Sequence, residues 1–269
     1  MGMEKIPIER FPGITQIQNL AAKYYERKLF AEVLSSAKIP KHIAIILDGN
    51  RRFAGEMGMD RLEGHVFGAK KLEKVIGWCQ ELDIKHITVY AFSTENFTRN
   101  EEEIKMLMEL MTKKFKDVAK DSRVHKYKIR VKAIGNIGLL PEKVQRAIDE
   151  AQEATSAYEG HTLNIAVGYG GRAELAEAVR KICERIKNGE INPKDVDENL
   201  IGNYLYTAGL PDPDLIIRTS GEERLSGFLL WQSAYSELYF CEANWPAFSK
   251  IDFLRAIRTY QGRERRLGK

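Results

Sequence analysis

Four segments of the sequence gather arginines, glycines and small polar residues, and each follows a short apolar run. They are Asp48–Arg52 (DGNRR), Ser93–Arg99 (STENFTR), Gly168–Arg172 (GYGGR) and Arg218–Ser226 (RTSGEERLS). Arginine side chains, backbone N–H groups at glycine turns and hydroxyls are the groups that bind a phosphate or diphosphate. One such segment would be explained as a solvated loop, whereas four of them favour a phosphate site.

Two acidic residues beside predicted strands are candidates for holding a metal ion. Asp48 follows the apolar run HIAIIL, and Glu237 opens the run ELYFC. An aspartate at the end of a strand suits Mg²⁺, which takes one or two carboxylates together with substrate phosphates and water. The three cysteines, Cys79, Cys183 and Cys241, lie far apart, so the sequence predicts neither a structural zinc site nor a disulfide framework.

Other catalytic motifs are absent or weak. The sequence contains no GxxxxGK[ST] phosphate loop, no GxSxG nucleophile elbow and no HExxH metal motif. The run Gly168-Tyr169-Gly170-Gly171 lacks the spacing and the downstream acid of a dinucleotide fingerprint. A P-loop kinase or ATPase is therefore disfavoured.

An alternation of strands and helices must position these side chains. The predicted strands are His42–Leu47, Lys85–Phe92, Lys128–Ile134, Thr162–Val167, Asp214–Arg218 and Glu237–Cys241. The predicted helices are Leu62–Leu82, Glu101–Lys120, Pro141–Tyr158, Arg172–Ile186 and Ile251–Gln261, with a short one between Pro193 and Pro211. This pattern predicts a single α/β domain with a mostly parallel sheet of about six strands surrounded by helices. Ligands bind beyond the carboxyl ends of such strands, so we expect the four segments and both candidate metal carboxylates at one edge of the sheet.

Residues 1–39 are predicted to form a helical extension that precedes the domain of residues 40–269. Apolar residues recur from Gln18 to Ala37 in an imperfect helical stripe, and Pro40 marks the boundary. A helix packed on the core or on a partner is the favoured interpretation. A surface helix that meets lipid or an apolar substrate is the alternative.

The composition of the 269-residue chain excludes several classes. With 42 Lys+Arg and 38 Asp+Glu, the net charge is only +4, so no nucleic-acid role is indicated. Hydrophobic residues make up 43%, which argues against pervasive disorder. No apolar run reaches the roughly 18–20 residues that span a bilayer, and residues 1–10 lack a signal-peptide core. The sequence predicts a soluble, cytoplasmic protein that at most contacts a membrane surface.

Several linked motifs resemble the cis-prenyltransferases, the family of undecaprenyl and dehydrodolichyl diphosphate synthases. The resemblance runs from about Ile39 to Lys269 and rests on HIAIILDGNRRFA, Gly64-His65, YAFSTENFTR, LNIAVGYGGR, IIRTSGEERLSGFLLWQ, SELYF and RERRLG. The absence of DDxxD separates the chain from trans-prenyltransferases. The GNRRF form looks more archaeal or eukaryotic than bacterial.

The resemblance implies a homodimer around a parallel sheet, with an elongated hydrophobic tunnel leaving its catalytic edge. An allylic prenyl diphosphate primer, farnesyl or geranylgeranyl, would bind at the tunnel mouth beside isopentenyl diphosphate. Mg²⁺ would assist departure of the primer's diphosphate, and each new double bond would be cis. The product would be a polycis-polyprenyl diphosphate that serves as a lipid-carrier precursor. Ala91, Phe92 and the helix segment Met106–Met111 are candidates for the tunnel lining.

The family's functional positions can be carried over by motif. Asp48 matches the catalytic, metal-associated aspartate, and Glu237 the second metal carboxylate. Ser93 and Asn96 match positions tied to substrate orientation and proton removal. The positions matched to the primer diphosphate are Gly49, Asn50, Arg51, Arg52 and Arg61. Further candidates for substrate binding are Phe53, His65, Phe97 and Arg99, the last in a mobile loop with Glu103. Those that bind isopentenyl diphosphate are Arg218, Arg224 and Ser226, completed by Arg266 and Gly268 from the neighbouring subunit.

Two other functions stay open at this point. Gly227 stands where the family pattern has asparagine, which leaves room for irregular coupling with dimethylallyl diphosphate as acceptor. A non-catalytic partner subunit of a cis-prenyltransferase is the other alternative. Such subunits lose the catalytic residues, whereas Asp48, Arg52, Asn96 and Arg218 are all present here.

Overall fold

Six parallel strands form one sheet in the order β3-β4-β2-β1-β5-β6 in the computed structural model, which describes residues 12–263. The strands are β1 (His42–Ile46), β2 (His86–Ser93), β3 (Ile129–Ile134), β4 (His161–Tyr169), β5 (Leu215–Arg218) and β6 (Glu237–Phe240). The predicted parallel α/β architecture is confirmed. Strand β1 is buried along its whole length, as expected of a continuous apolar run covered on both faces.

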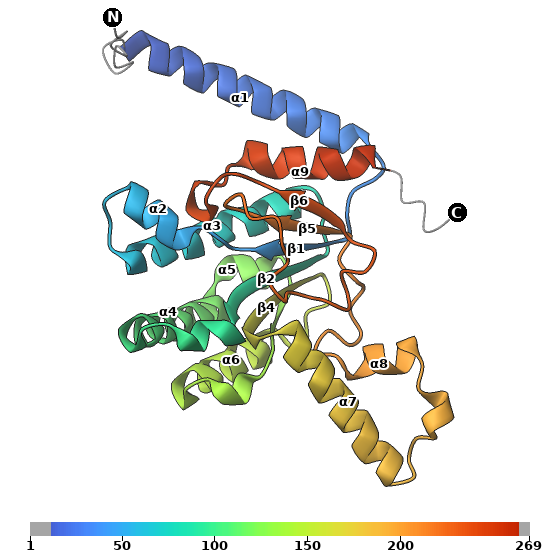
Figure 1. Ribbon diagram of the computed structural model, residues 1–269. Helices are drawn as coiled ribbons and strands as arrows, with labels where there is room; N and C mark the ends of the chain where they lie inside the picture. The colour runs from blue at the N-terminus through green and yellow to red at the C-terminus, as the bar shows by residue number, and fades with distance from the viewer. Residues whose placement is uncertain (1–11, 264–269) are drawn as a thin grey trace, which may run out of the picture.

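The described chain has nine helices, most of which pack around the sheet (Figure 1). They are α1 (Pro12–Ser35), α2 (Asn50–Glu56), α3 (Arg61–Glu81), α4 (Glu101–Lys120), α5 (Ser122–Lys126), α6 (Glu142–Thr155), α7 (Gly171–Lys187), α8 (Glu198–Tyr204) and α9 (Lys250–Gly262). Four short 3-10 turns are η2 (Thr94–Thr98), η3 (Ile137–Leu139), η4 (Pro193–Asp195) and η5 (Trp245–Ala247). Helices α7 and α8 project from the body, while α4 and α6 pack along one another near β3.

Local signals explain where helices begin, and two expectations need correction. The Asp60 carboxylate accepts from the N–H of Leu62, and Glu63 accepts from the N–H of Asp60, which together fix the start of α3. Helix α6 begins one residue later than expected because Pro141 is its N-cap. Helices α2 and α5 were not predicted, since their seven and five residues are too few for a clear 3.6-residue period.

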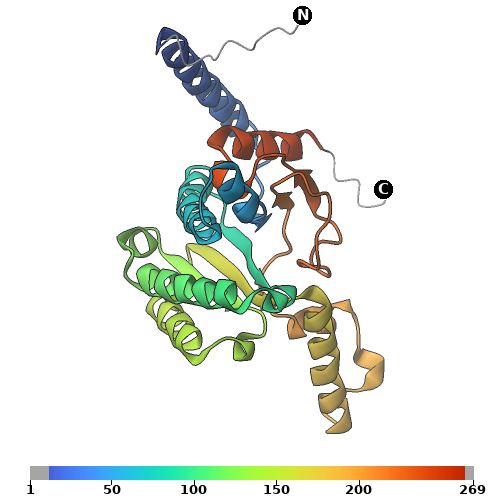
Figure 2. The same ribbon diagram turned by 60° about the vertical axis from the view of Figure 1, so that its left-hand side comes forward.

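The N-terminal helix α1 rests on α9 with its last turns only. Leu29 and Val33 are buried, and the Gln261 amide donates to the carbonyl of Val33 at 2.9 Å. This confirms core packing for that half of the helix. The preceding half runs past the body of the protein, where Leu20 and Tyr24 are exposed (Figures 1 and 2). Among the described residues, no helix combines the length and apolarity needed to cross a bilayer.

A buried histidine at the amino end of β1 makes folding stability depend on pH. The imidazole of His42 contacts the carbonyl of Pro211 and the hydroxyl of Thr88, at 2.6 and 2.8 Å. Burial lowers the pKa of His42 to about 4, from 6.5. Below pH 6.5 the unfolded chain therefore binds a proton that the folded chain does not, so the free energy of unfolding falls as the pH drops toward 4.

We expect His42→Gln to weaken this pH dependence. Between about pH 7 and about pH 5, His42 should account for a loss of about 2 kcal/mol, at about 1.4 kcal/mol per pKa unit. Urea unfolding of wild type and variant at the two pH values measures it, with the variant losing about 2 kcal/mol less. An equal loss in both proteins would contradict the pKa shift of His42.

Candidate active site

A cavity of about 1140 Å³ opens at the carboxyl edge of the sheet and continues beneath α3 and α4. Its mouth is polar, with Asp48, Ser93 and Arg218 among the lining residues. Its body is apolar and is lined by Ala91, Phe92, Leu107, Leu110, Met111, Phe115, Val118, Leu163 and Ile165. The volume exceeds the range of about 300–1,000 Å³ that is usual for small-molecule sites. A large cavity with an apolar body therefore leads from the carboxyl edge of the sheet, where the resemblance implies a tunnel.

Strand register brings three of the four predicted segments together, whereas Gly168–Arg172, at the end of β4, does not line this cavity. Ile46 is paired with Tyr90 on one side and with Arg218 on the other, so the residues after β1, β2 and β5 emerge at the same edge. Asp48 follows β1 by two residues and is held firmly. Its carbonyl accepts from the hydroxyl of Thr219 at 2.7 Å and from the N–H of Trp245 at 2.9 Å.

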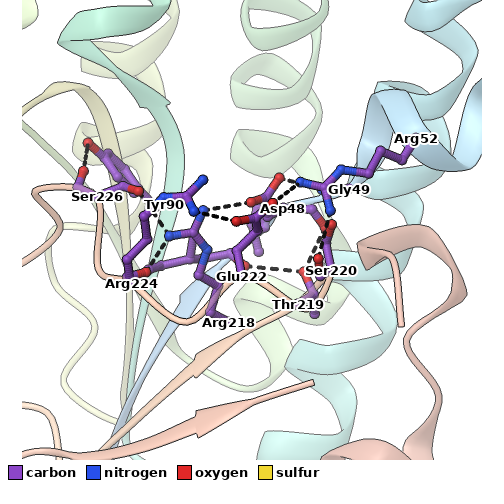
Figure 3. A network of polar contacts seen from close by, with 12 residues as sticks. Asp48, Gly49, Arg52, Tyr90, Arg218, Thr219, Ser220, Glu222, Arg224 and Ser226 are labelled. Atoms are coloured by element: carbon purple, nitrogen blue, oxygen red, sulfur yellow. Dashed lines mark hydrogen bonds and ion pairs between the residues drawn. The ribbon is translucent and has the colours of Figure 1, made fainter. Parts of the chain in front are cut away.

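The carboxylate of Asp48 joins two elements of the site (Figure 3). Its Oδ2 lies 2.7 Å from Nη2 of Arg218, and its Oδ1 accepts from the N–H of Gly49 at 2.7 Å. Gly49 has φ +96°, and a Cβ there would lie 2.3 Å from Oδ1 of Asn244. Only glycine fits this turn, which starts α2 next to Asp48. The side chain of Asn50 instead donates to the carbonyl of Leu47 at 2.9 Å and so secures α2.

Arg218 is buried and connects Asp48 to the loop that follows β5. Its side chain is 5% exposed, and besides Asp48 its guanidinium donates to Oγ of Ser226 at 2.9 Å and to the carbonyl of Arg224. Its Nε has no protein partner although it is buried. Ser220 and Ser226 have φ +78° and +48°, a left-handed conformation that costs free energy outside glycine. Arg218 thus holds a strained loop against Asp48.

A carboxylate bridges two further arginines across the mouth. Arg52 donates to Oε1 of Glu222 at 2.6 Å and to the carbonyl of Ser220 at 2.7 Å, and Arg224 donates to the other oxygen of Glu222 (Figure 3). The hydrogen bonds from Arg52 and Arg224 lower the pKa of Glu222. Two arginines with one carboxylate leave net positive charge, which suits a diphosphate.

A second cationic cluster surrounds the carboxylate of Glu103 at the start of α4. Arg99 is 3.2 Å from Oε1 of Glu103, and Arg51, Arg61 and His65 each approach a carboxylate oxygen to 3.9 Å. Burial, assisted by the charge of Arg99, lowers the pKa of His65 to about 4, so its ring is neutral near pH 7. Three guanidiniums against one carboxylate form an anion-attracting wall of the mouth.

Ser93 and Asn96 lie together at the end of β2, where η2 begins. The amide oxygen of Asn96 accepts from the N–H of Ser93 at 3.0 Å, and both residues line the cavity. This contact orients the amide of Asn96 with its NH₂ group free to approach a ligand.

Some predicted binding residues are not in the cavity lining. Phe53 packs against Phe67 with ring centroids 6.0 Å apart, and Phe97 packs against Phe92 at 4.9 Å. Neither Phe53 nor Phe97 lines the cavity, and the exposed side chain of Arg224 contacts the site through Glu222. Their roles toward a substrate stay predictions. Arg266 and Gly268 lie outside the described residues.

The prediction that Glu237 lies beside Asp48 at the carboxyl edge of the sheet is wrong for two residues of the same chain. Glu237 is the first residue of β6 and pairs with Leu215, three residues before Arg218. That distance is roughly 10 Å along the strand, toward the amino edge of the sheet. Arg263 donates to Oε2 of Glu237 at 2.6 Å. Glu237 therefore cannot share a metal ion with Asp48 of the same chain.

The remaining residues still fit a magnesium ion. No group of three or more His, Cys, Asp and Glu side chains between residues 12 and 263 could hold a metal by itself. A cage made only of protein groups is unnecessary for Mg²⁺, which binds through a carboxylate, substrate phosphates and water. Asp48 keeps lone pairs beyond its contacts with Gly49 and Arg218, so it can serve as that carboxylate.

Sequence reasoning missed three residues that build this site. Glu222 bridges Arg52 and Arg224, Thr219 anchors Asp48, and the hydroxyl of Tyr90 donates to the carbonyl of Tyr169 at 3.1 Å at the cavity mouth. The two acids Glu222 and Glu223 directly before Arg224 were a signal for Glu222. No local pattern pointed to Thr219 or Tyr90.

The chain is similar to curated archaeal enzymes along nearly all of its length. A family model described as putative undecaprenyl diphosphate synthase matches residues 46–268. The tritrans,polycis-undecaprenyl-diphosphate synthase (geranylgeranyl-diphosphate specific) of Methanocaldococcus jannaschii is 55% identical over 249 residues, 92% of this chain and 89% of the relative. The enzyme of the same name from Methanopyrus kandleri is 53% identical over 92% of this chain and 91% of its own.

Solved structures agree with this similarity. Lavandulyl diphosphate synthase from Lavandula x intermedia, in complex with dimethylallyl diphosphate, superposes with a TM-score of 0.81 at 36% identity, over 86% of this chain and 99% of that one. A probable undecaprenyl diphosphate synthase from Campylobacter jejuni gives 0.69 at 32% identity, over 87% and 100%. Together with the tunnel and its cationic mouth, these similarities show that the chain belongs to the undecaprenyl diphosphate synthase family of cis-prenyltransferases and is an enzyme of the polyprenyl diphosphate synthase type.

Proposed function

We propose that the enzyme extends geranylgeranyl or farnesyl diphosphate with isopentenyl diphosphate, in the presence of Mg²⁺, to a polycis-polyprenyl diphosphate that serves as a lipid-carrier precursor. The observation that carries the proposal is the continuity of the cationic mouth with the apolar cavity. A diphosphate head and a prenyl chain need these two environments side by side. The names of the archaeal relatives favour geranylgeranyl diphosphate as the primer.

The diphosphate of the first substrate is proposed to lie near Asp48 and Arg52. The arginines around Glu103, which are Arg51, Arg61 and Arg99, would form its other side. Breaking its allylic C–O bond leaves the electron pair and negative charge on the diphosphate, which these arginines stabilise. Mg²⁺, when bound through Asp48, supplies further positive charge to the departing group. The neutral His65 faces this charge as a hydrogen-bonding group rather than as a cation.

The second substrate is proposed to bind where Arg218 meets Ser226. Its terminal double bond attacks the allylic carbon to form the new C–C bond, and a proton then leaves the neighbouring carbon. The departed diphosphate is proposed to accept that proton, while Ser93 and Asn96, which both line the cavity, are proposed to orient this substrate and to assist the proton's removal. The growing chain moves into the apolar cavity after each addition.

A second candidate is irregular coupling with dimethylallyl diphosphate as acceptor. It is favoured by the similarity to the lavandulyl diphosphate synthase structure, whose name includes that ligand, and by Gly227 beside Ser226. Gly227 has φ +78°, and a Cβ there would meet no atom within 4 Å, so the loop leaves space at this point.

Product analysis separates the two functions. The purified enzyme is supplied with geranyl, farnesyl or geranylgeranyl diphosphate, together with either isopentenyl or dimethylallyl diphosphate. Mass spectrometry of the dephosphorylated products should show a ladder of five-carbon additions with isopentenyl diphosphate only. If a product of one addition formed with dimethylallyl diphosphate as acceptor, and none formed with isopentenyl diphosphate, the irregular reaction would be supported instead. Full activity after removal of Mg²⁺ with a chelator would contradict the magnesium proposal.

The proposed homodimer makes a separate prediction, because the resemblance places Arg266 and Gly268 across the interface. Deleting residues 266–269 should impair use of isopentenyl diphosphate while leaving a folded dimer. Mixing this truncated chain with Asp48→Ala chains should restore some activity, since one site of each mixed dimer would have both Asp48 and a donated tail. No restoration despite demonstrated subunit exchange would show that the tail does not act across the interface.

The proposed reaction would deliver a lipid product, so we also propose transient contact with a membrane surface.

A further inference from the structure

A small apolar patch lies outside the cavity mouth, on α2 and α3. Phe53 and Met57 are four residues apart, so they share one face of α2 and of the turn that ends it. The ring centroid of Phe67, on α3, lies 6.0 Å from that of Phe53. Met57 is 56% exposed and Phe67 is 40% exposed. Single exposed apolar side chains are ordinary, whereas a group of them beside a binding site indicates an interaction surface.

The patch borders the mouth because α2 has two different faces. Arg51, Arg52 and Gly55 line the cavity, and so does Met59 just after the helix. The three patch residues, Phe53, Met57 and Phe67, do not belong to that lining. They therefore form part of the outer surface next to the opening, so whatever covers the patch also lies beside the cavity mouth.

Basic side chains accompany the patch. Nζ of Lys70 lies 5.6 Å from the ring centroid of Phe67. An aromatic ring with a basic neighbour suits a membrane interface, where the ring enters the acyl boundary and the ammonium stays among the headgroups. Three exposed arginines around the patch are offset by three exposed acids: Arg51, Arg52 and Arg61 against Glu56, Asp60 and Glu63. The patch itself therefore has little net charge.

The exposed half of α1 adds an excess of positive charge. Leu20 and Tyr24 are exposed four residues apart on one face of the helix. The exposed basic residues beside them are Lys23, Arg27 and Lys28. Glu26 is the one acidic residue between positions 12 and 28, and it lies 3.9 Å from Lys250 of α9. Figure 1 shows this half of α1 extending toward the side of the molecule on which α2 lies. Apolar residues with an excess of Lys and Arg favour an anionic bilayer surface.

We propose that the patch of Phe53, Met57 and Phe67, with the exposed half of α1, docks on an anionic lipid bilayer and holds the cavity mouth against it. This inference rests on the proposed function, whose primer and product carry long prenyl chains. Moving such a chain through water exposes its apolar surface, which is unfavourable. A mouth that lies on the bilayer lets the chain pass directly between the acyl region and the cavity. A second copy of the chain fits this face less well, because a two-fold contact would bring the like-charged halves of α1 together.

The test measures co-sedimentation of the full chain with vesicles of phosphatidylglycerol and phosphatidylcholine in equal amounts, and with vesicles of phosphatidylcholine alone. Met57→Ser and Phe67→Ser each remove one exposed apolar side chain. Tyr127→Ser is the matched control, because Tyr127 is 41% exposed and Nζ of Lys126 lies 5.4 Å from its ring centroid. Tyr127 lies just before β3, at the amino edge of the sheet and away from the mouth. Thermal melting of each variant checks that it is folded.

We expect wild type and Tyr127→Ser to bind the phosphatidylglycerol vesicles equally. Each patch variant should bind them about three- to tenfold more weakly, since it loses part of the apolar area that enters the bilayer. The double variant should bind more weakly than either single one. Binding should also decrease as salt is raised, and it should be weak with phosphatidylcholine alone, because the basic residues need anionic headgroups.

The docking surface and the proposed function can fail separately, since vesicle binding needs no chemistry. If wild type makes no polyprenyl ladder but binds vesicles through the patch, the proposed function fails and the docking surface is supported. If the ladder forms and the patch variants bind vesicles as well as wild type, or wild type does not bind, the docking surface is overturned. If light scattering without vesicles shows that the patch variants break up a larger assembly, a second copy covers the patch and the lipid proposal is wrong. If one patch variant does not fold, the other carries the same decision.

Discussion

Asp48→Ala is expected to lower kcat by about a hundredfold or more, with only a modest change in the KM for the primer. In the proposed function, Asp48 lies where charge develops on the departing diphosphate and is the carboxylate for Mg²⁺. The arginines proposed to bind the diphosphate are other residues, among them Arg52 and Arg61, so primer affinity should persist. Steady-state kinetics with the primer and isopentenyl diphosphate varied separately measure the effect.

Two further variants sharpen the interpretation of Asp48. Asp48→Asn keeps an oxygen for the N–H of Gly49 but lacks the charge that faces Arg218, so it should be nearly as inactive as Asp48→Ala. Asp149→Asn changes a carboxylate on the exposed face of α6 and should behave as wild type. Near-normal kcat in Asp48→Ala would remove Asp48 from the chemistry.

The sheet could be predicted because its strands carry strong local signals. The run HIAIIL predicts a strand that is covered on both faces, and β1 is indeed fully buried. Helices α3, α4 and α9 were predicted to within about two residues, since each has a long apolar face. Helix α2 gave no such signal, because its seven residues are mostly polar or small.

The position of Glu237 shows what an edge strand conceals. A residue that opens a strand lies at the amino edge if the strand is parallel and at the carboxyl edge if it is antiparallel. The sequence ELYFC does not state that direction, and only the pairing of Glu237 with Leu215 fixes it. Contacts between distant segments are likewise invisible locally: Arg52 and Glu222 are 170 residues apart, yet they form one side of the mouth.

The cavity itself was foreseen only through the resemblance. Ala91, Phe92 and Met111 were candidates for its lining and are found there. Met108, from the same candidate helix segment, is instead buried in the core, because it lies on another face of α4. Which side chains face the tunnel depends on how α3 and α4 are rotated, and packing against α2 and α6 decides that rotation.

Arg218→Ala and Arg224→Ala should have different effects, although the two residues were predicted to bind the same diphosphate. Arg218 is buried and joins Asp48 to Ser226, so its loss leaves Asp48 without its cation and frees the strained loop. We expect a rise in the KM for isopentenyl diphosphate of tenfold or more, from a charge-assisted contact worth roughly 1.5–3 kcal/mol, together with a fall in kcat.

Arg224 is exposed and contacts the site through Glu222, so Arg224→Ala should raise only the KM for isopentenyl diphosphate, and by a smaller factor. Arg218→Lys provides the conservative comparison. A lysine keeps the charge but cannot reach Asp48, Ser226 and the carbonyl of Arg224 at once, so it should restore little of the lost kcat. If Arg218→Lys were as active as wild type, charge alone would suffice at this position, and the forked contact between Asp48 and the loop would have no role in turnover.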